Sequence, residues 1–187
     1  MNYPGAELDN FDKATFWRRY IYSKIKKFIK GDVLEVGAGI GSFTNNYKHI
    51  AKNLTLSEID NNNFSIIKKK FSNTKFKFTK NFTKDLNEKF DTIMYLNVLE
   101  HIRNDEDEII SAFNKLNKNG FLIILVPAHN KLYSKFDKAV GHFKRYEIDF
   151  FNKINVKDSK RYKLIYLDSM GYFLYFLNKL FFKEEVY

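Results

Sequence analysis

The chain has 187 residues, 44% of them hydrophobic and 29% charged, which fits one globular domain and excludes a disordered chain. Its formal net charge is +10, but the lysines are spread along the whole chain, so the charge alone does not indicate a nucleic-acid partner. The absence of cysteine excludes disulfides and cysteine chemistry and makes a reducing cytosol the expected location, and no apolar run reaches the roughly 18 residues of a membrane span.

Residues 12–30 are expected to form a helix that precedes the first strand. Trp17, Ile21, Ile25 and Ile29 recur at helical spacing, and lysine and arginine fill the other face. Gly31 is a suitable residue to end the helix. We expect the apolar stripe to pack on the core.

A short apolar strand at 32–36 runs directly into the turn Gly37-Ala38-Gly39-Ile40-Gly41. In α/β folds, closely spaced glycines after a strand bring backbone N–H groups up to a ligand. The order is G-x-G-x-G, whereas a dinucleotide-binding fingerprint would need its third glycine at Ser42. Glu35 lies inside this strand and needs a cation or a hydrogen-bond donor there.

Two further strand–helix units are expected after this turn. A first crossover helix spans 42–51, and a second strand ends in Ser57-Glu58-Ile59-Asp60. An acid such as Glu58 at this strand end can accept the hydroxyls of a ribose, and Asp60 is a suitable N-cap for a helix at 61–71. A short third strand at 75–79 leads to Asn81 and Phe82.

The fourth strand is expected at Phe90–Leu96, followed by Asn97-Val98-Leu99-Glu100-His101. A helix at 105–118 begins with four acids that suit its N-terminal dipole, and Asn119-Gly120 ends it. The unbroken apolar run 121–126 predicts a buried fifth strand. The alternation of strands and helices predicts an α/β fold with a doubly wound, mostly parallel sheet and helices on both faces. Ligands of such sheets bind at the carboxyl ends of the strands.

Residues 128–150 form a long polar and aromatic connection, and long connections in compact domains are usually functional. A helix is expected around 147–154 and a sixth strand at 161–168. The aromatic stretch 170–182 is followed by no clear strand, so the expected C-terminal strand hairpin is incomplete. Either the chain is a truncation or the sheet ends early.

Three segments together resemble class I S-adenosylmethionine (SAM) methyltransferases of the small-molecule type: VLEVGAGIGSFT (33–44), YLNVLEHIRND (95–105) and LYSKFDKAVGHFKRY (132–146). The third resembles a bacterial group associated with sugar and cell-envelope biosynthesis. Members of that group usually have Asp where Asn97 stands and Arg where Lys144 stands. The resemblance implies one Rossmann-like domain over 1–187, with a helix at 12–30, a SAM-binding core at 31–127 and an acceptor-side part at 128–187.

The resemblance also implies that SAM is the methyl donor and S-adenosylhomocysteine the product. Glu35 is expected to attract the ammonium group of SAM, Glu58 to accept its ribose hydroxyls, and Asn81 and Phe82 to hold its adenine. The full expected cofactor set is Glu35, Gly37, Ala38, Gly39, Gly41, Glu58, Ile59, Asn81, Phe82, Asn97 and Val98.

Methyl transfer from a sulfonium mainly requires positioning of the acceptor and exclusion of water, with a general base where the acceptor is a hydroxyl. The candidate catalytic residues are His142, His101, Glu100 and His129. Lys144 and Arg145 could bind an acidic group of the acceptor, or they could form a solvated helix start. Tyr133 and Tyr146 could stack on a sugar, or they could belong to the core. The acids and histidines show no metal-ligand spacing, so no metal is expected.

The favoured function is methyl transfer to a small molecule, specifically a saccharide- or lipid-linked precursor. An RNA methyltransferase is supported only by the positive charge, and strand four lacks an Asn/Asp-Pro-Pro-Tyr motif. A non-catalytic SAM-binding partner subunit is a third candidate, which the intact glycine turn and Glu58 oppose. The aromatic segment 172–182 is a candidate contact with a membrane surface or an apolar carrier. The sequence indicates no oligomeric state.

Overall fold

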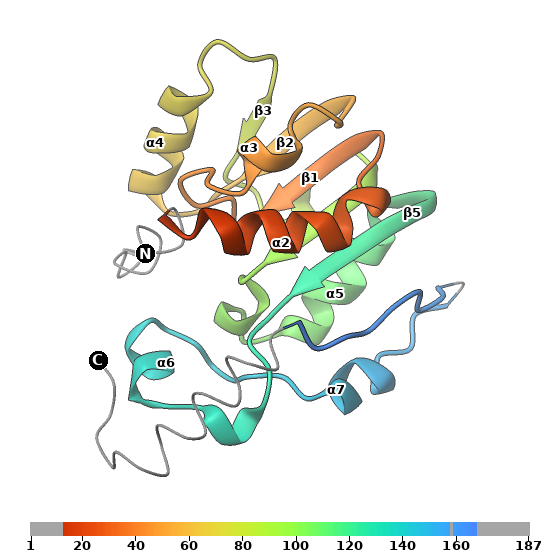
Figure 1. Ribbon diagram of the computed structural model, residues 1–187. Helices are drawn as coiled ribbons and strands as arrows, with labels where there is room; N and C mark the ends of the chain where they lie inside the picture. Colours follow the sequence, from red (N-terminus) through yellow and green to blue (C-terminus); the bar gives the residue numbers. More distant parts are fainter. Residues whose placement is uncertain (1–12, 158, 168–187) are drawn as a thin grey trace.

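The computed structural model describes residues 13–157 and 159–167. Within them, five strands form one parallel sheet in the order β3-β2-β1-β4-β5 (Figure 1). The strands are β1 (Asp32–Val36), β2 (Asn53–Ser57), β3 (Lys77–Thr79), β4 (Phe90–Leu96) and β5 (Leu116–Leu125). The predicted parallel sheet is confirmed.

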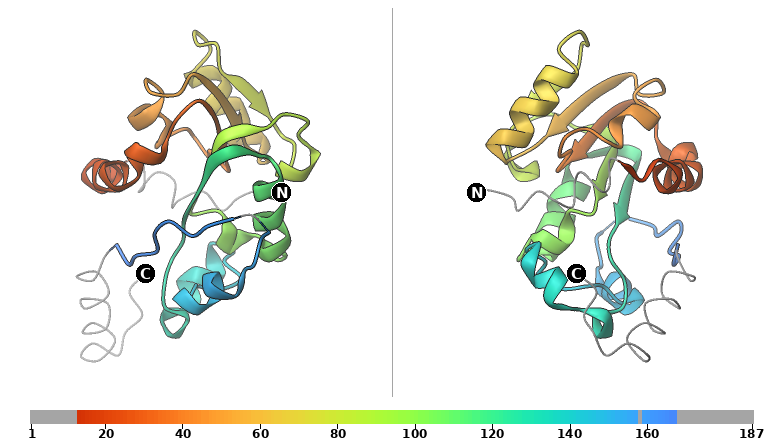
Figure 2. Two further views of the ribbon diagram at one scale, coloured as in Figure 1. Left: turned by 90° about the vertical axis from the view of Figure 1, so that its right-hand side faces the viewer. Right: turned by 60° about the vertical axis from the view of Figure 1, so that its left-hand side comes forward.

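Helices cover both faces of this sheet (Figure 2). The longer ones are α2 (Thr15–Ile25), α4 (Asn61–Lys70) and α5 (Asp105–Asn114). The short ones are α3 (Thr44–Tyr47), α6 (Lys135–Ala139) and α7 (Ile148–Lys153), with 3-10 turns η1 (Lys26–Phe28), η2 (Thr83–Asp85), η3 (Leu99–His101) and η4 (Asn130–Leu132). No helix of the described residues is long and apolar enough to cross a membrane.

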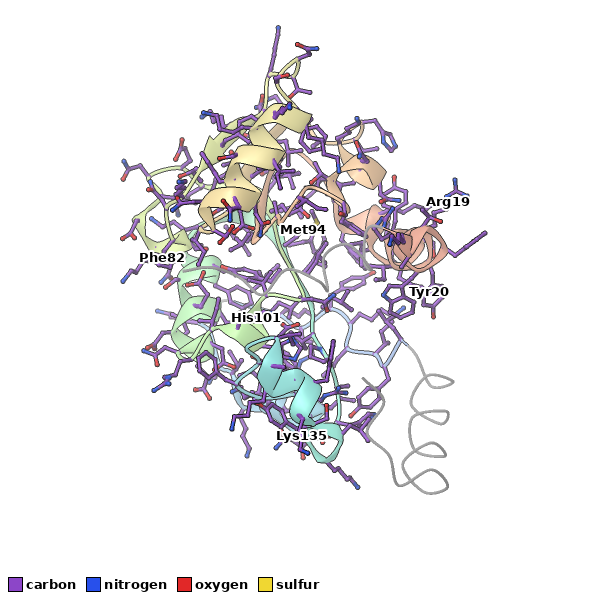
Figure 3. All side chains as sticks on the ribbon, turned by 90° about the vertical axis from the view of Figure 1, so that its left-hand side faces the viewer. Arg19, Tyr20, Phe82, Met94, His101 and Lys135 are labelled. Carbon is purple, nitrogen blue, oxygen red and sulfur yellow. The ribbon has the colours of Figure 1, made fainter. Side chains whose placement is uncertain are left out.

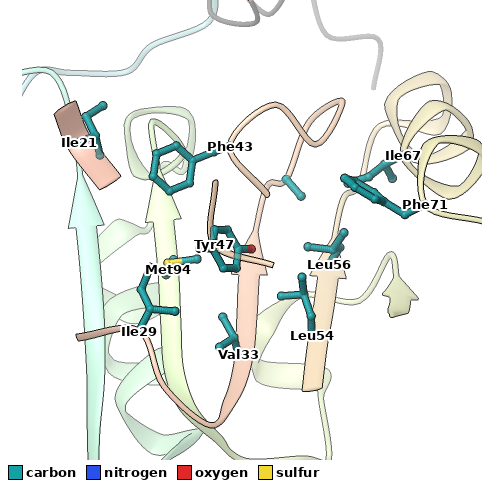
Figure 4. Packing of buried hydrophobic residues seen from close by; sticks show 11 residues of the cluster. Ile21, Ile29, Val33, Phe43, Tyr47, Leu54, Leu56, Ile67, Phe71 and Met94 are labelled. Carbon is teal, nitrogen blue, oxygen red and sulfur yellow. The ribbon is translucent and has the colours of Figure 1, made fainter. Parts of the chain in front are cut away.

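Alternation along the strands builds two separate cores, because successive side chains of a strand point to opposite faces. Val33 and Met94 pack in one core with Ile21 of α2, Tyr47 of α3 and Ile67 of α4 (Figure 4). The opposite core combines strand residues with residues of α5 and of the segment after α6; its buried members are Leu34, Leu86, Phe90, Ile93, Tyr95, Leu99, Ile109, Ala112 and Tyr146. This two-sided burial is the predicted doubly wound arrangement.

The helix predicted at 105–118 is one turn shorter in the structure. Lys115 N donates to Ala112 O, which ends α5 at Asn114, and the chain then joins the sheet at Leu116. Phe90 of β4 pairs with Leu116 of β5, and the next pair joins Thr92 to Phe121. The residues of β5 between these two pairs therefore bulge out of the ladder. From Phe121 the predicted fifth strand pairs with β4 as expected.

Two other expected elements differ from the structure. The crossover helix expected at 42–51 is only the single turn α3. The sixth strand expected at 161–168 is wrong for the described residues 161–167, which contain no strand. Side-chain contacts hold this segment instead: Arg161 bonds to Asn152 Oδ1 and to the carbonyl oxygen of Phe151. The aromatic stretch 170–182 and the C-terminal hairpin lie outside the described residues.

The long connection after β5 is structured rather than a simple loop. It contains η4 and α6, and a parallel bridge between Ala128 and Tyr146 returns it to the end of β5. Helix α7 then forms within the predicted range 147–154. This connection lies beyond the carboxyl end of β5, beside the end of β4 (Figure 1).

Candidate active site

The glycine turn connects the end of β1 to α3. Gly37, Gly39 and Gly41 all have positive φ, at 64°, 55° and 71°. A Cβ at Gly37 would lie 2.6 Å from Val98 Cγ2, and one at Gly41 would lie 2.5 Å from Phe71 Cε2. Both the backbone conformation and the packing therefore require glycine at these two positions.

Glu58 ties this turn to the end of the neighbouring strand β2. Its Oε2 accepts the backbone N–H of Gly39 at 2.7 Å, and its Oε1 accepts that of Asp60 at 2.8 Å. The side chain is buried, and burial raises the pKa of its carboxyl above the usual value. Each carboxylate oxygen has a second acceptor site, so Glu58 can still accept hydroxyl groups of a ligand.

Glu35 is buried beneath the same turn. Its Oε2 accepts hydrogen bonds from Thr44 Oγ1 at 2.6 Å and from the Tyr47 hydroxyl at 2.5 Å. Burial raises the pKa of this carboxyl to about 7, despite the opposing effect of these two hydrogen bonds. Glu35 therefore anchors α3 to β1, a role that the sequence did not reveal.

Two large apolar residues adjoin the ends of β2 and β3 in the chain, where Ile59 follows Glu58 and Phe82 follows Asn81. Ile59 is 49% exposed and Phe82 is 55% exposed, although both are large and hydrophobic. Ser57 Oγ donates to the carbonyl oxygen of Asn81, which keeps the ends of β2 and β3 together. A buried carboxylate and two exposed apolar residues at neighbouring strand ends fit a ligand that has a diol and a flat apolar ring.

Asn97 and Val98 stand at the end of β4, opposite the glycine turn. Asn97 has a φ of 57°, and its backbone N–H donates to Leu125 O. Val98 is half-buried and packs over Gly37. The structure thus gathers the expected cofactor residues of β1, β2, β3 and β4 at one edge of the sheet.

Glu100, His101 and His142 meet next to the end of β4. Glu100 and His101 belong to η3, whereas His142 follows α6, and Figure 3 shows His101 close to that helix. One potential ligand atom from each residue lies within 4.8 Å of the other two. The two imidazole rings are edge to face at 4.7 Å. The pKa of His101 is lowered to about 4, chiefly by burial and to a smaller extent by the neighbouring His142.

Asp137 organises this part of the site, and sequence reasoning missed it. Its Oδ1 contacts His142 Nδ1 and Arg145 Nε, both at 2.9 Å. Its Oδ2 accepts the N–H and hydroxyl of Ser134. Burial opposes ionisation of Asp137, but the bonds from Arg145 and His142 hold its carboxyl pKa below the usual value. The signal was present as the capping box formed by Ser134 and Asp137.

The four expected acceptor-binding residues form hydrogen bonds or ion pairs with other residues of the protein. Arg145 pairs with Asp137, and Lys144 Nζ lies 2.7 Å from Asp105 Oδ2. The hydroxyl of Tyr146 also donates to Asp105 Oδ2, at 2.7 Å, and the residue is buried. The Tyr133 hydroxyl donates to the carbonyl oxygen of His142. These contacts fix the segment that carries His142 against the start of α5.

The structure does not bring His129 into this group. Its Nδ1 lies 3.7 Å from Glu147 Oε2, and its ring stacks on Tyr166 at 4.6 Å. Both rings line a cavity of about 1910 Å³ between β5 and the segment that follows α6. His129 is therefore placed apart from Glu100, His101 and His142.

Comparisons with known proteins agree with this geometry. A family model described as a methyltransferase domain matches residues 14–165. The chain is similar to the solved structure of an S-adenosylmethionine-dependent methyltransferase from Clostridium acetobutylicum, with 23% identity and a TM-score of 0.55 over 70% of this chain and 60% of that one. It also resembles YcgJ from Bacillus subtilis, with 12% identity and a TM-score of 0.63 over 73% of this chain and 65% of that one.

A third similar structure is the glycopeptide N-methyltransferase MtfA complexed with SAM, with 15% identity and a TM-score of 0.52 over 63% of this chain and 52% of that one. At these identities the likeness shows the fold. The chain spans less than two thirds of the length of each of these three structures. A search of the curated proteins gives no match.

Proposed function

The chain belongs to a family of methyltransferase domains, and we propose that it transfers a methyl group from SAM to a small-molecule acceptor. The observation that carries this proposal is the bond between Gly39 N and Glu58 Oε2, which joins the glycine turn to the end of β2. This bond places backbone N–H groups and a carboxylate at one edge of a parallel sheet, where such sheets bind ligands.

The residues present fit SAM. Glu58 would accept the ribose hydroxyls through its remaining acceptor sites, and Ile59 and Phe82 would enclose the adenine. The turn at Gly37–Gly41 and the neighbouring Asn97 and Val98 would hold the methionine part. Glu35 would act on the ammonium group indirectly, because its Oε2 already accepts Thr44 and Tyr47.

When bound, SAM supplies a methyl group that its sulfonium has already activated. The protein therefore has to orient the acceptor, exclude water and, for a hydroxyl acceptor, help remove its proton. We assign this acceptor-side role to Glu100, His101 and His142, since they stand beside Asn97 and Val98 and combine a carboxylate with two imidazoles. Asp137 would position His142 through its contact with Nδ1.

We further propose that the acceptor is a saccharide- or lipid-linked precursor. The support is the resemblance of residues 132–146 to methyltransferases associated with sugar and envelope biosynthesis. A small acceptor also fits the enclosure of this side by η3 and by the connection that carries α6. RNA is disfavoured because the clustered lysines of α4 lie on a helix, not at the strand ends.

The test is methyl transfer from radiolabelled SAM into the RNA, glycan and organic-soluble fractions of cells, with Glu58→Ala protein as the control. Label in the glycan or organic-soluble fraction that depends on Glu58 is the expected result. Label in RNA alone would overturn the choice of acceptor. Calorimetry with SAM and with NAD tests the cofactor separately, because tighter binding of NAD would contradict a methyltransferase.

A further inference from the structure

We propose that Glu100, His101 and His142 form a binding site for one divalent transition-metal ion, of the class of Zn²⁺ or Co²⁺. The sequence alone did not predict a metal, because these residues come from η3 and from the segment after α6. Folding brings them together, and each offers one ligand atom to a shared point. This inference does not depend on the identity of the methyl donor.

The spacing of the three ligand atoms suits a metal ion. They lie within 4.8 Å of one another. A point equidistant from three atoms at that spacing is about 2.8 Å from each, whereas bonds from zinc to nitrogen or oxygen are about 2.0–2.2 Å. Each side chain therefore has to close by less than about 1 Å, which small side-chain rotations can supply.

Groups around the ligands hold the two histidines as metal sites require. Metal-bound histidines almost always use one ring nitrogen for the metal and the other for a carboxylate or a carbonyl. His142 Nδ1 contacts Asp137 Oδ1 at 2.9 Å, which leaves Nε2 as the ligand atom. The His101 ring hydrogen-bonds to the backbone of Gly141. Arg145 and Ser134 in turn hydrogen-bond to Asp137, which is itself fully buried.

The ligand set also decides the kind of ion. Two imidazoles and one carboxylate favour zinc and neighbouring transition metals, whereas Mg²⁺ prefers an oxygen-only set. Three protein ligands leave a coordination position for another molecule. Because the site adjoins the end of β4, an acceptor oxygen could take that position and lose its proton more readily.

The proposal is tested on the full chain after treatment with EDTA and dialysis. Calorimetry with Zn²⁺ is expected to show one equivalent bound, and Co²⁺ is expected to give the visible absorption bands of a protein-bound ion. Glu100→Gln and His142→Ala are each expected to weaken Zn²⁺ binding at least tenfold. Asp137→Asn is expected to weaken it by about 10- to 100-fold, the effect typical of a residue that positions a ligand.

His49→Ala is the matched control, because it removes an exposed histidine that lies outside the cluster and contacts Tyr22. This variant is expected to bind Zn²⁺ as the wild type does. The proposal is overturned if the wild type binds no Zn²⁺ and gives no Co²⁺ bands, or if the cluster variants and His49→Ala bind equally. Circular dichroism checks that each variant is folded, and the Co²⁺ spectrum of the wild type remains decisive if one is not.

Discussion

Replacement of Glu35 by glutamine is expected to change how the stability of the protein depends on pH. Glu35 is buried and its pKa is raised from 4.5 to about 7, chiefly by burial. Between these two values the folded state holds a proton that the unfolded state has lost. Stability therefore falls as the pH rises through this range.

The size of the effect follows from the shift itself. One pKa unit corresponds to about 1.36 kcal/mol, so a shift from 4.5 to about 7 costs the folded state about 3 kcal/mol above pH 7. Glutamine does not titrate, and its carbonyl oxygen can still accept a hydrogen bond from Thr44 or Tyr47. Relative to the wild type, Glu35→Gln should thus gain about 3 kcal/mol of stability between pH 4.5 and pH 7.5.

Urea unfolding at a series of pH values, in EDTA, measures this difference. Wild type and variant have to be compared directly, because His101 changes the pH dependence of stability in the opposite direction to Glu35. Its pKa falls from 6.5 to about 4 in the folded state, so its contribution to stability rises with pH in this window. Subtracting the two curves removes that contribution. Parallel curves for wild type and Glu35→Gln would refute the reasoning, because they would show that Glu35 is ionised in the folded protein throughout.

Three further substitutions test the site and its framework. Glu58→Ala should weaken SAM binding by about 1–3 kcal/mol in calorimetry, the usual value of hydrogen bonds to a charged group, and unchanged affinity would remove Glu58 from the cofactor site. Gly41→Ala should lower the unfolding free energy by more than about 1 kcal/mol, because φ is 71° and the new Cβ would meet Phe71 at 2.5 Å; an unchanged urea midpoint would contradict this. His142→Ala should lower methyl transfer and leave SAM affinity nearly unchanged, so a parallel loss of SAM binding would place His142 on the cofactor side.

The arrangement of the glycine turn and Glu58 could be predicted from the sequence because its signals are local, whereas their role in binding SAM stays a prediction. The turn at Gly37–Gly41 follows its strand directly, and the position of Glu58 at the next strand end depends only on the parallel sheet. The two hydroxyl partners of Glu35 were not predicted. They stand 9 and 12 residues away, on a helix whose single turn has too few residues to show a periodic pattern.

The errors in the fold have a similar physical origin. Residues 115–118 continue the helical pattern of α5, but pairing with β4 outweighs this local preference, and the ladder begins at Leu116. Residues 161–167 are rich in aliphatic and aromatic residues, as a strand would be. They lie against the protein through side chains such as Tyr162, whose ring packs on Phe28 and Phe121. Composition cannot distinguish such a segment from one that is paired in a sheet.

Different kinds of hydrogen bond stabilise the two sides of the candidate site. The difference bears on the acceptor specificity of the protein. On the proposed cofactor side, the partners of Glu58 are backbone N–H groups, which every residue except proline supplies. On the proposed acceptor side, the buried carboxylate of Asp137 contacts Ser134, His142 and Arg145, all of which belong to the connection after β5. A change in that segment would move several side chains at once, including the ring of His142. The proposed donor contacts belong to the sheet, and the proposed acceptor contacts belong to a connection between elements. A chain built in this way can keep one methyl donor while its acceptor changes.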